Sequence, residues 1–195
     1  MKRRSFMCGA VATLAVGGFE LAGCTTTGNQ PATAATDMSK RQSIDASVDG
    51  TISRLYSTVQ GSRELAGKSQ GLLVFPSVVE VGFIVGGQYG EGALRVGGSS
   101  VGYYSTVSAA FGFLAGGQSK SLIFLFLTQD ALNHFRNSDG WTAGADASIA
   151  LLKIGANGAI DTTTATAPVE AIVLTNAGLM GNVSLDGTKV SRLKI

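Results

Sequence analysis

A serine, an aspartate and a histidine follow one another along this chain in the order found in one class of serine hydrolase. Residues 98–102 read Gly-Ser-Ser-Val-Gly, a literal GxSxG pattern with Ser100 as the nucleophile, and Asp130 and His134 follow downstream. In that enzyme class a helix must start directly after the serine. Here glycine, tyrosine and β-branched residues follow Ser100, and they favour a strand. We therefore interpret this segment as a loop between strands.

Other catalytic arrangements have little support in the sequence. His134 is the single histidine of the chain, so no histidine pair can hold a metal ion. Glu80 and Glu91 flank a glycine-rich segment and could approach each other as a carboxylate pair if the two strands paired through a turn. The alternative is that both keep a strand edge soluble. We expect a protein that is not an enzyme and has no cofactor and no metal.

Two glycine-rich segments come close to phosphate-binding motifs. Gly90-Glu91-Gly92 begins a dinucleotide fingerprint, but Arg95 stands where the third glycine belongs. Gly67-Lys68-Ser69 ends like a P-loop, but Ser62 stands where its first glycine belongs. We interpret these glycines as turns and bulges, with an anion-binding nest as the alternative.

The chain is organised around residues 71–96, where β-branched and apolar residues alternate with glycine. Residues 72–75 predict a short buried strand that Pro76 ends, and residues 78–85 predict a second. Glycines at 86, 87, 90 and 92 are too dense for a helix and indicate a hairpin or barrel corner. The sequence predicts a β-rich α+β domain with an antiparallel, barrel-like sheet.

Residues 44–59 predict the one long amphipathic helix. At about 100° per residue, five apolar side chains fall within an arc of about 80°: Ile44, Val48, Ile52, Leu55 and Val59. The helix ends at Gly61 or Gly67. One interpretation packs this stripe on the sheet. The other lays it on a bilayer, where four basic residues reach for lipid phosphates: Lys40, Arg41, Arg54 and Arg63.

The second half of the chain predicts further strands and one short helix. Strands are expected at residues 121–128, 146–154, 169–175 and 179–185, and a helix at 130–136. Asp186-Gly187 predicts a hairpin turn that pairs residues 189–193 with the preceding strand. The aromatic residues Trp141, Tyr89, Tyr103 and Tyr104 form either core or an interfacial set. Lys189, Arg192 and Lys194 form a small basic end.

The N-terminus resembles a bacterial export signal. Residues 1–23 have a basic start, an apolar stretch and small residues at the end, and Arg3-Arg4 also fits a twin-arginine signal. Leu21-Ala22-Gly23-Cys24 resembles the lipobox, so Cys24 is the expected lipidation site, carrying acyl chains such as palmitate. Residues 24–39 predict a flexible tether and residues 40–195 the domain. The expected location is the outer membrane, at its periplasmic face or the surface.

Charge excludes one class of function. The chain carries a formal charge of +2, but removing residues 1–23 takes away three basic residues and one acidic residue. Twelve of each then remain. A nucleic-acid-binding protein needs a concentrated basic face, so we expect no nucleic acid as a partner.

Four ordered segments resemble the SYLF domain family: GLLVFP, VGFIVGGQYGEGAL, QDALNHF with SDGW, and GLMGNVSLDGTKVSRL. The resemblance extends from Ile44 to Leu193. It implies lipid binding, in eukaryotic members through an N-terminal amphipathic segment and basic residues, and in some members actin binding. The helix at 44–59, with Arg54 and Arg63, occupies the corresponding place. Actin is not expected as a partner in a bacterial envelope.

The sequence therefore predicts an envelope lipoprotein that binds lipid without catalysis. The expected partners are the membrane that holds the Cys24 anchor and an anionic phospholipid or other amphiphile. The competing hypothesis is a structural or protein-interaction lipoprotein that takes no small ligand.

Overall fold

The computed structural model describes residues 34–82, 85–111, 118–152, 160, 167–175, 178–179 and 185–195. The chain divides into two compact units, Met1–Pro31 and Ala32–Ile195, and every described residue belongs to the second. The predicted export signal, Cys24 and the first ten residues of the predicted tether lie outside the described residues.

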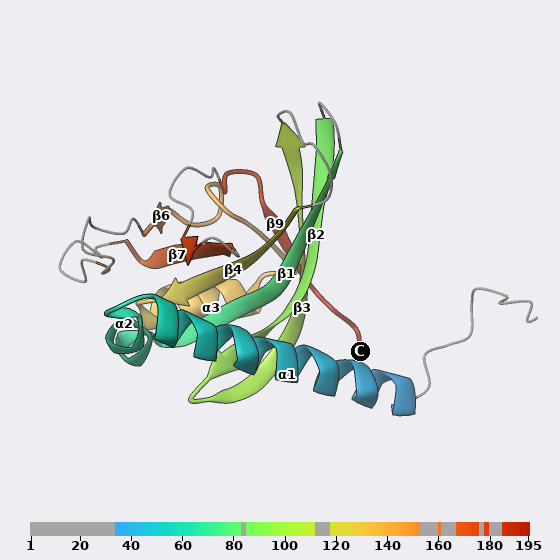
Figure 1. Cartoon of the computed structure of the whole chain (residues 1–195), viewed down its shortest axis with the longest axis horizontal. Coiled ribbons are helices and arrows are strands. Elements are labelled where there is room, and N and C mark those ends of the chain that lie inside the picture. The colour runs from blue at the N-terminus through green and yellow to red at the C-terminus, as the bar shows by residue number, and fades with distance from the viewer. Residues whose placement is uncertain are drawn as a thin grey trace, which may run out of the picture. The chain divides into compact units, whose positions relative to one another are not determined.

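The described part of the chain contains nine strands in one sheet (Figure 1). They are β1 Gly71–Gly82, β2 Val85–Val96, β3 Ser99–Phe111, β4 Gln118–Phe126, β5 Gly140–Thr142, β6 Ile149–Leu151, β7 Val169–Thr175, β8 Gly178–Leu179 and β9 Lys189–Arg192. Their order is β5-β9-β3-β2-β1-β4-β7-β6, and β8 pairs with β7. The sheet is strongly curled, and among the described strands β6 and β7 are the one pair that runs parallel. The predicted β-rich α+β fold with a barrel-like sheet is confirmed.

Within the described residues three helices accompany the sheet: α1 Ala34–Thr58, α2 Ser62–Lys68 and α3 Gln129–Asn137. The Thr128 hydroxyl accepts a hydrogen bond from the Ala131 N–H (3.2 Å) and caps α3, the predicted short helix. α2 is a second short helix that the sequence did not predict. Gly61 separates it from α1 because its φ of 81° breaks the helical path. α1 begins at Ala34, six residues before the predicted domain boundary, so residues 34–39 of the predicted flexible tether are helical. Ala34, Ala35 and Met38 are good helix formers in this segment.

Pro76 does not end its strand, contrary to the prediction. β1 runs through it, and the register with both neighbouring strands shifts between Val74 and Val78. A bulge leaves a residue unpaired, so the missing N–H of proline costs no ladder hydrogen bond there. The Pro76 carbonyl accepts a hydrogen bond from the Ser121 hydroxyl (2.6 Å). Residues 71–82 therefore form one long bent strand.

The glycines at 86, 87, 90 and 92 lie within β2 rather than in turns. Two of them face the bulge of β1. A Cβ on Gly92 would lie 2.0 Å from the Val74 carbonyl oxygen, and a Cβ on Gly90 would lie 2.9 Å from that of Ser77. The predicted association of glycine with a bulge is thus correct, but the bulge is on the partner strand.

β9 has different partners from those predicted. The turn at Asp186-Gly187 forms, with Gly187 at φ 76° and the Thr188 N–H bonded to the Leu185 carbonyl (3.1 Å). The residues after it pair with β3 on one edge and with β5 on the other. Residues 180–184, most of the strand predicted before the turn, lie outside the described residues. These contacts are distant in sequence, and a local turn signal cannot reveal them.

Helices cover both faces of the sheet and enclose two apolar cores. On one face, α1 and α2 pack against alternate residues of the central strands, among them Val74, Ile123 and Ile172. On the other, α3 packs with Trp141 against the residues between them. Because β-strand side chains alternate, each central strand supplies both cores.

Candidate functional site

The apolar stripe of α1 packs on the sheet. Val48 is fully buried, Ile44 is 8% exposed, and Ile52 is half-buried against the same core. The structure therefore agrees with the interpretation in which the stripe packs on the sheet, and not with the one in which it lies on a bilayer. In this conformation Ile44, Val48 and Ile52 face protein, so they could contact a bilayer only if α1 left the sheet.

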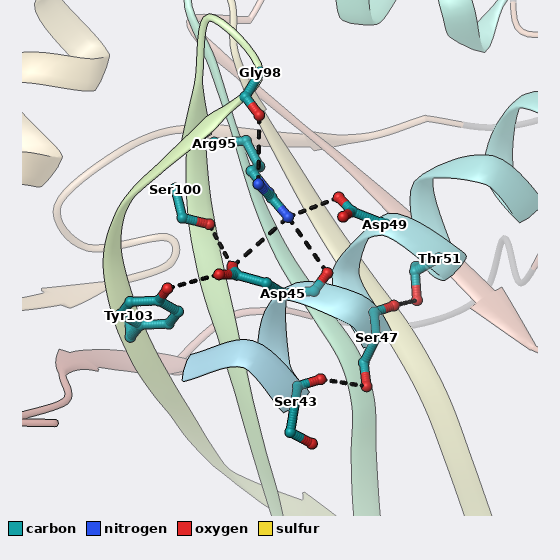
Figure 2. Close-up of polar contacts among 9 residues, drawn as sticks. All are labelled: Ser43, Asp45, Ser47, Asp49, Thr51, Arg95, Gly98, Ser100 and Tyr103. Atoms are coloured by element: carbon teal, nitrogen blue, oxygen red, sulfur yellow. Dashed lines mark hydrogen bonds and ion pairs between the residues drawn. The ribbon is translucent and has the colours of Figure 1, made fainter. Parts of the chain in front are cut away.

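A polar cluster fastens α1 to the β2–β3 hairpin (Figure 2). Arg95 lies at its centre and donates to an Asp49 carboxylate oxygen (2.6 Å) and to the Asp45 carbonyl (3.3 Å). The carboxylate of Asp45 lies 3.6 Å from the same guanidinium. The Gly98 carbonyl accepts a further hydrogen bond from Arg95 (3.3 Å). An arginine with little exposure therefore joins two helical carboxylates to the hairpin.

Asp45 is also the hydrogen-bond partner of Ser100, the serine of the GxSxG segment. The Ser100 hydroxyl donates to one of its oxygens (2.6 Å) and the Tyr103 hydroxyl to the other (2.8 Å). Ser100 lies on β3, on the side that α1 covers, whereas His134 lies on α3, which packs on the opposite face. The three hydrolase-like residues are not assembled. Their order in the sequence is a coincidence of a glycine-rich chain.

The four candidate lipid-binding cations have different surroundings. Lys40 forms an ion pair with Glu91 (2.8 Å). Arg41 donates to the backbone oxygen of Ile195 and lies over the Tyr103 ring, 6.0 Å from its centroid.

The other two basic residues have no carboxylate partner within the described residues. Arg54 donates to the Ser121 hydroxyl (2.7 Å), and Arg63 stacks on the Tyr56 ring at 4.5 Å from its centroid. Both guanidinium groups therefore keep unpaired N–H donors.

Glu80 and Glu91 are not brought together. Glu80 accepts a hydrogen bond from the Gln88 amide (3.0 Å) and pairs with Lys120 at 3.4 Å. Glu91 instead pairs with Lys40 and accepts a hydrogen bond from the Tyr89 hydroxyl (2.7 Å). Each acid has its own cation, and the carboxylate-pair hypothesis is not supported by their positions.

Hydrogen bonding around Glu91 shifts two pKa values in opposite directions. Burial pulls the pKa of Glu91 up, but hydrogen bonds from Lys40 and Tyr89 outweigh it and the pKa lies below its ordinary value. For Tyr89, the hydrogen bond to Glu91, with burial and the carboxylate charge, raises the pKa to about 12.

We expect Tyr89 to ionise only near pH 12, because loss of its proton would put a phenolate beside the Glu91 carboxylate. Glu91→Gln removes that charge and should return the Tyr89 pKa toward about 10. Ultraviolet titration of phenolate, taken as the difference from Tyr89→Phe, measures both values. An ordinary Tyr89 pKa in the unsubstituted protein would contradict the hydrogen bond.

The aromatic residues that the sequence grouped together lie in three environments. Trp141 and Tyr104 are buried in the core under α3. Tyr103 is half-buried against α1, where it bonds Asp45. Only Tyr89 is exposed, so these residues do not form one interfacial set.

Three exposed apolar side chains form a row that the sequence did not predict. Val79, Tyr89 and Val107 are direct cross-strand partners on β1, β2 and β3, and they are 44%, 50% and 51% exposed. Each of the three lies in a strand whose side chains alternate between the two faces of the sheet, and this alternation could have indicated an exposed position. Without the register of all three strands, however, their alignment could not be known.

The described residues offer no other reactive site. They contain no group of three or more His, Cys, Asp or Glu side chains placed to hold a metal ion. Glu170 is a single buried acid on β7, and burial raises its pKa although the Ala167 N–H bonds to it. Neither α1 nor the two shorter described helices combines the length and apolar character needed to cross a membrane.

Residues 107–194 match a family model described as "Ysc84: Las17-binding protein actin regulator". The match starts within β3 and includes β4, α3, β7 and β9. None of the curated proteins compared with the chain matches it. The match agrees with the SYLF resemblance over this segment and indicates a domain that binds lipid or protein.

Proposed function

Because residues 107–194 belong to the Ysc84 (SYLF) family, a family of binding domains that is not known for enzymatic activity, we propose that this protein binds anionic lipid without catalysis. The lipid is a phospholipid or another amphiphile with a negative headgroup. No chemical step is needed, and the acids that join α1 to the β2–β3 hairpin, Asp45 and Asp49, are already engaged by Arg95, with Ser100 and Tyr103 bonded to Asp45.

One observation carries the proposal: Arg54 and Arg63 have no carboxylate partner among the described residues. Arginine presents a planar fork of N–H donors that matches a phosphate group. Its contacts here, one serine hydroxyl and one aromatic ring, leave donors available. Lys40 and Arg41 are less available, since each already has an oxygen partner.

The proposed setting is a bacterial envelope, with the protein held by acyl chains on Cys24 at the outer membrane. α1 begins at Ala34, ten residues after Cys24. Ten extended residues reach at most about 35 Å, so the domain would stay close to the membrane that holds the anchor. Actin is not a partner in that compartment.

Vesicle co-sedimentation of residues 32–195 tests lipid binding apart from the anchor. This unit contains both apolar cores and so carries its own folding core. It should sediment with vesicles of phosphatidylglycerol and phosphatidylcholine at low salt and be released as salt rises. The double variant Arg54→Gln, Arg63→Gln should bind about thirtyfold more weakly, because each basic residue near an anionic surface contributes about 1 kcal/mol.

The matched control removes a basic residue from the other face. Arg136 is exposed on α3, which packs on the opposite side of the sheet. Arg136→Gln should therefore leave vesicle binding nearly unchanged. Absence of binding to anionic vesicles at low salt would refute the proposed function.

Protein interaction is the second candidate, favoured by the family description, which names a protein that binds Las17 and regulates actin. For this chain it would mean an envelope lipoprotein that presents a surface to another protein and takes no small ligand. Native mass spectrometry of the purified domain separates the two candidates. Co-purified lipid supports lipid binding. A domain that is lipid-free and does not sediment with vesicles supports protein interaction.

A further inference from the structure

The exposed row of Val79, Tyr89 and Val107 lies on the same sheet face as α1. Tyr103, two positions before Ser105 and four before Val107 on β3, packs in the core under α1. Side chains at alternate positions of a strand share a face, so Val107 points to the α1 side as well. Tyr89 confirms this placement, because its hydroxyl bonds Glu91, which pairs with Lys40 of α1.

The row is the exposed continuation of a face that α1 covers elsewhere. The next positions toward the end of the sheet on this face, Gly87 on β2 and Ala109 on β3, are cross-strand partners and are exposed too. Neither carries a charge or a large side chain. This face is therefore apolar and accessible at Val79 on β1, at Tyr89 and Gly87 on β2, and at Val107 and Ala109 on β3.

Basic residues border this apolar row on two sides. Lys189 on β9 is the exposed cross-strand partner of Val107. The Glu91 carboxylate also lies beside the row, where it accepts a hydrogen bond from Tyr89, and Lys40 of α1 balances its charge. Arg54 of α1 bonds Ser121 on β4, two residues from Ser119, which is the β4 partner of Val79.

We propose that the row Val79–Tyr89–Val107 is the surface through which this protein contacts an anionic bilayer. The apolar side chains enter the headgroup–acyl boundary, and Lys189 and Arg54 lie at the level of the phosphates. This inference rests on the proposed lipid binding and names the face that performs it. It assigns the contact to the sheet and leaves the stripe of α1 in the core.

The charge and composition of the surface favour a bilayer over a second copy of the chain. Three half-exposed side chains offer far less than the roughly 800 Å² per partner of a stable interface. A symmetric pairing would also bring like-charged borders together, whereas an anionic bilayer is complementary to them. Tyrosine, with an apolar ring and a polar hydroxyl, is the residue type that prefers this boundary.

Single substitutions in residues 32–195 test the face with a matched pair. Val107→Asp places a carboxylate in the row, while Val101→Asp makes the same change on the same strand at a valine that is 44% exposed and outside the row. Each substitution adds one negative charge, so the two variants have the same net charge. We expect Val107→Asp to weaken binding to phosphatidylglycerol-containing vesicles at least tenfold, since apolar burial is exchanged for a desolvated charge. Val101→Asp should stay within about twofold of the unsubstituted unit.

A milder variant covers the case in which Val107→Asp fails to fold. Val107→Thr keeps the shape and strand preference of valine and should weaken binding about threefold to fivefold. If the unsubstituted unit binds vesicles while Val107→Asp and Val107→Thr bind equally well, this inference is overturned and the proposed function stands. If the unsubstituted unit does not bind, both are overturned. A dimer in sedimentation that Val107→Asp converts to monomer would also overturn it.

Discussion

Gly92→Ala is expected to destabilise the domain by about 3 kcal/mol or more, or to prevent folding. The Cβ of alanine would lie 2.0 Å from the Val74 carbonyl oxygen and 2.8 Å from the Phe75 ring. Both atoms belong to the bulged part of β1, whose backbone cannot move without breaking its pairing with β4. Overpacking against mobile side chains costs about 1–3 kcal/mol, and a fixed backbone gives less relief. Urea denaturation followed by Trp141 fluorescence measures the change.

Gly87→Ala is the matched control, because Gly87 lies on the same strand and a Cβ there would have nothing within 4 Å. Its effect should be small or slightly stabilising, since alanine restricts the unfolded chain. If Gly92→Ala were as stable as Gly87→Ala, the close approach of β1 and β2 at the bulge would be wrong.

Trp141→Ala should cost about 3–5 kcal/mol. Trp141 is 1% exposed, and its ring centroid lies 5.5 Å from those of Phe124 and Phe135. Both contacts are edge-on, the favourable geometry for aromatic pairs. Deleting the ring opens a cavity between α3 and the sheet. Thermal unfolding followed by circular dichroism measures the loss.

Trp141→Phe should lose less stability, because it retains one ring at this position. Any Trp141→Ala protein that remains folded should bind anionic vesicles as the unsubstituted domain does, since Trp141 lies in the core under α3. A loss of vesicle binding without a loss of stability would instead place this residue at an interface.

Local patterns were enough to predict the elements that depend on short-range chemistry. The apolar run of β4, the short helix α3 and the turn at Asp186-Gly187 need only neighbouring residues. The sequence misplaced the end of the strand at Pro76, because a bulge that tolerates proline depends on two partner strands. It likewise misassigned the partner of β9, since pairing with β3 joins residues far apart in the chain.

Charge pairing was less predictable than apolar burial. The 3.6-residue period placed Ile44 and Val48 on one helical face, and the structure buries them. Nothing local connected Asp45 with Arg95, which lies fifty residues away and binds it across the α1–sheet boundary. The exposed row on β1, β2 and β3 was hidden for the same reason, because its members meet only when three strands are in register.

Fluorescence quenching by lipids brominated on their acyl chains tests the central claim most directly. In residues 32–195, Val107→Trp puts a fluorophore in the row and Val101→Trp puts one outside it, while buried Trp141 gives the same background in both. With anionic vesicles, we expect strong quenching of the tryptophan at position 107 and little at position 101. Equal quenching at both positions, or none at position 107 in a vesicle-bound protein, would contradict a membrane contact through this face of the sheet.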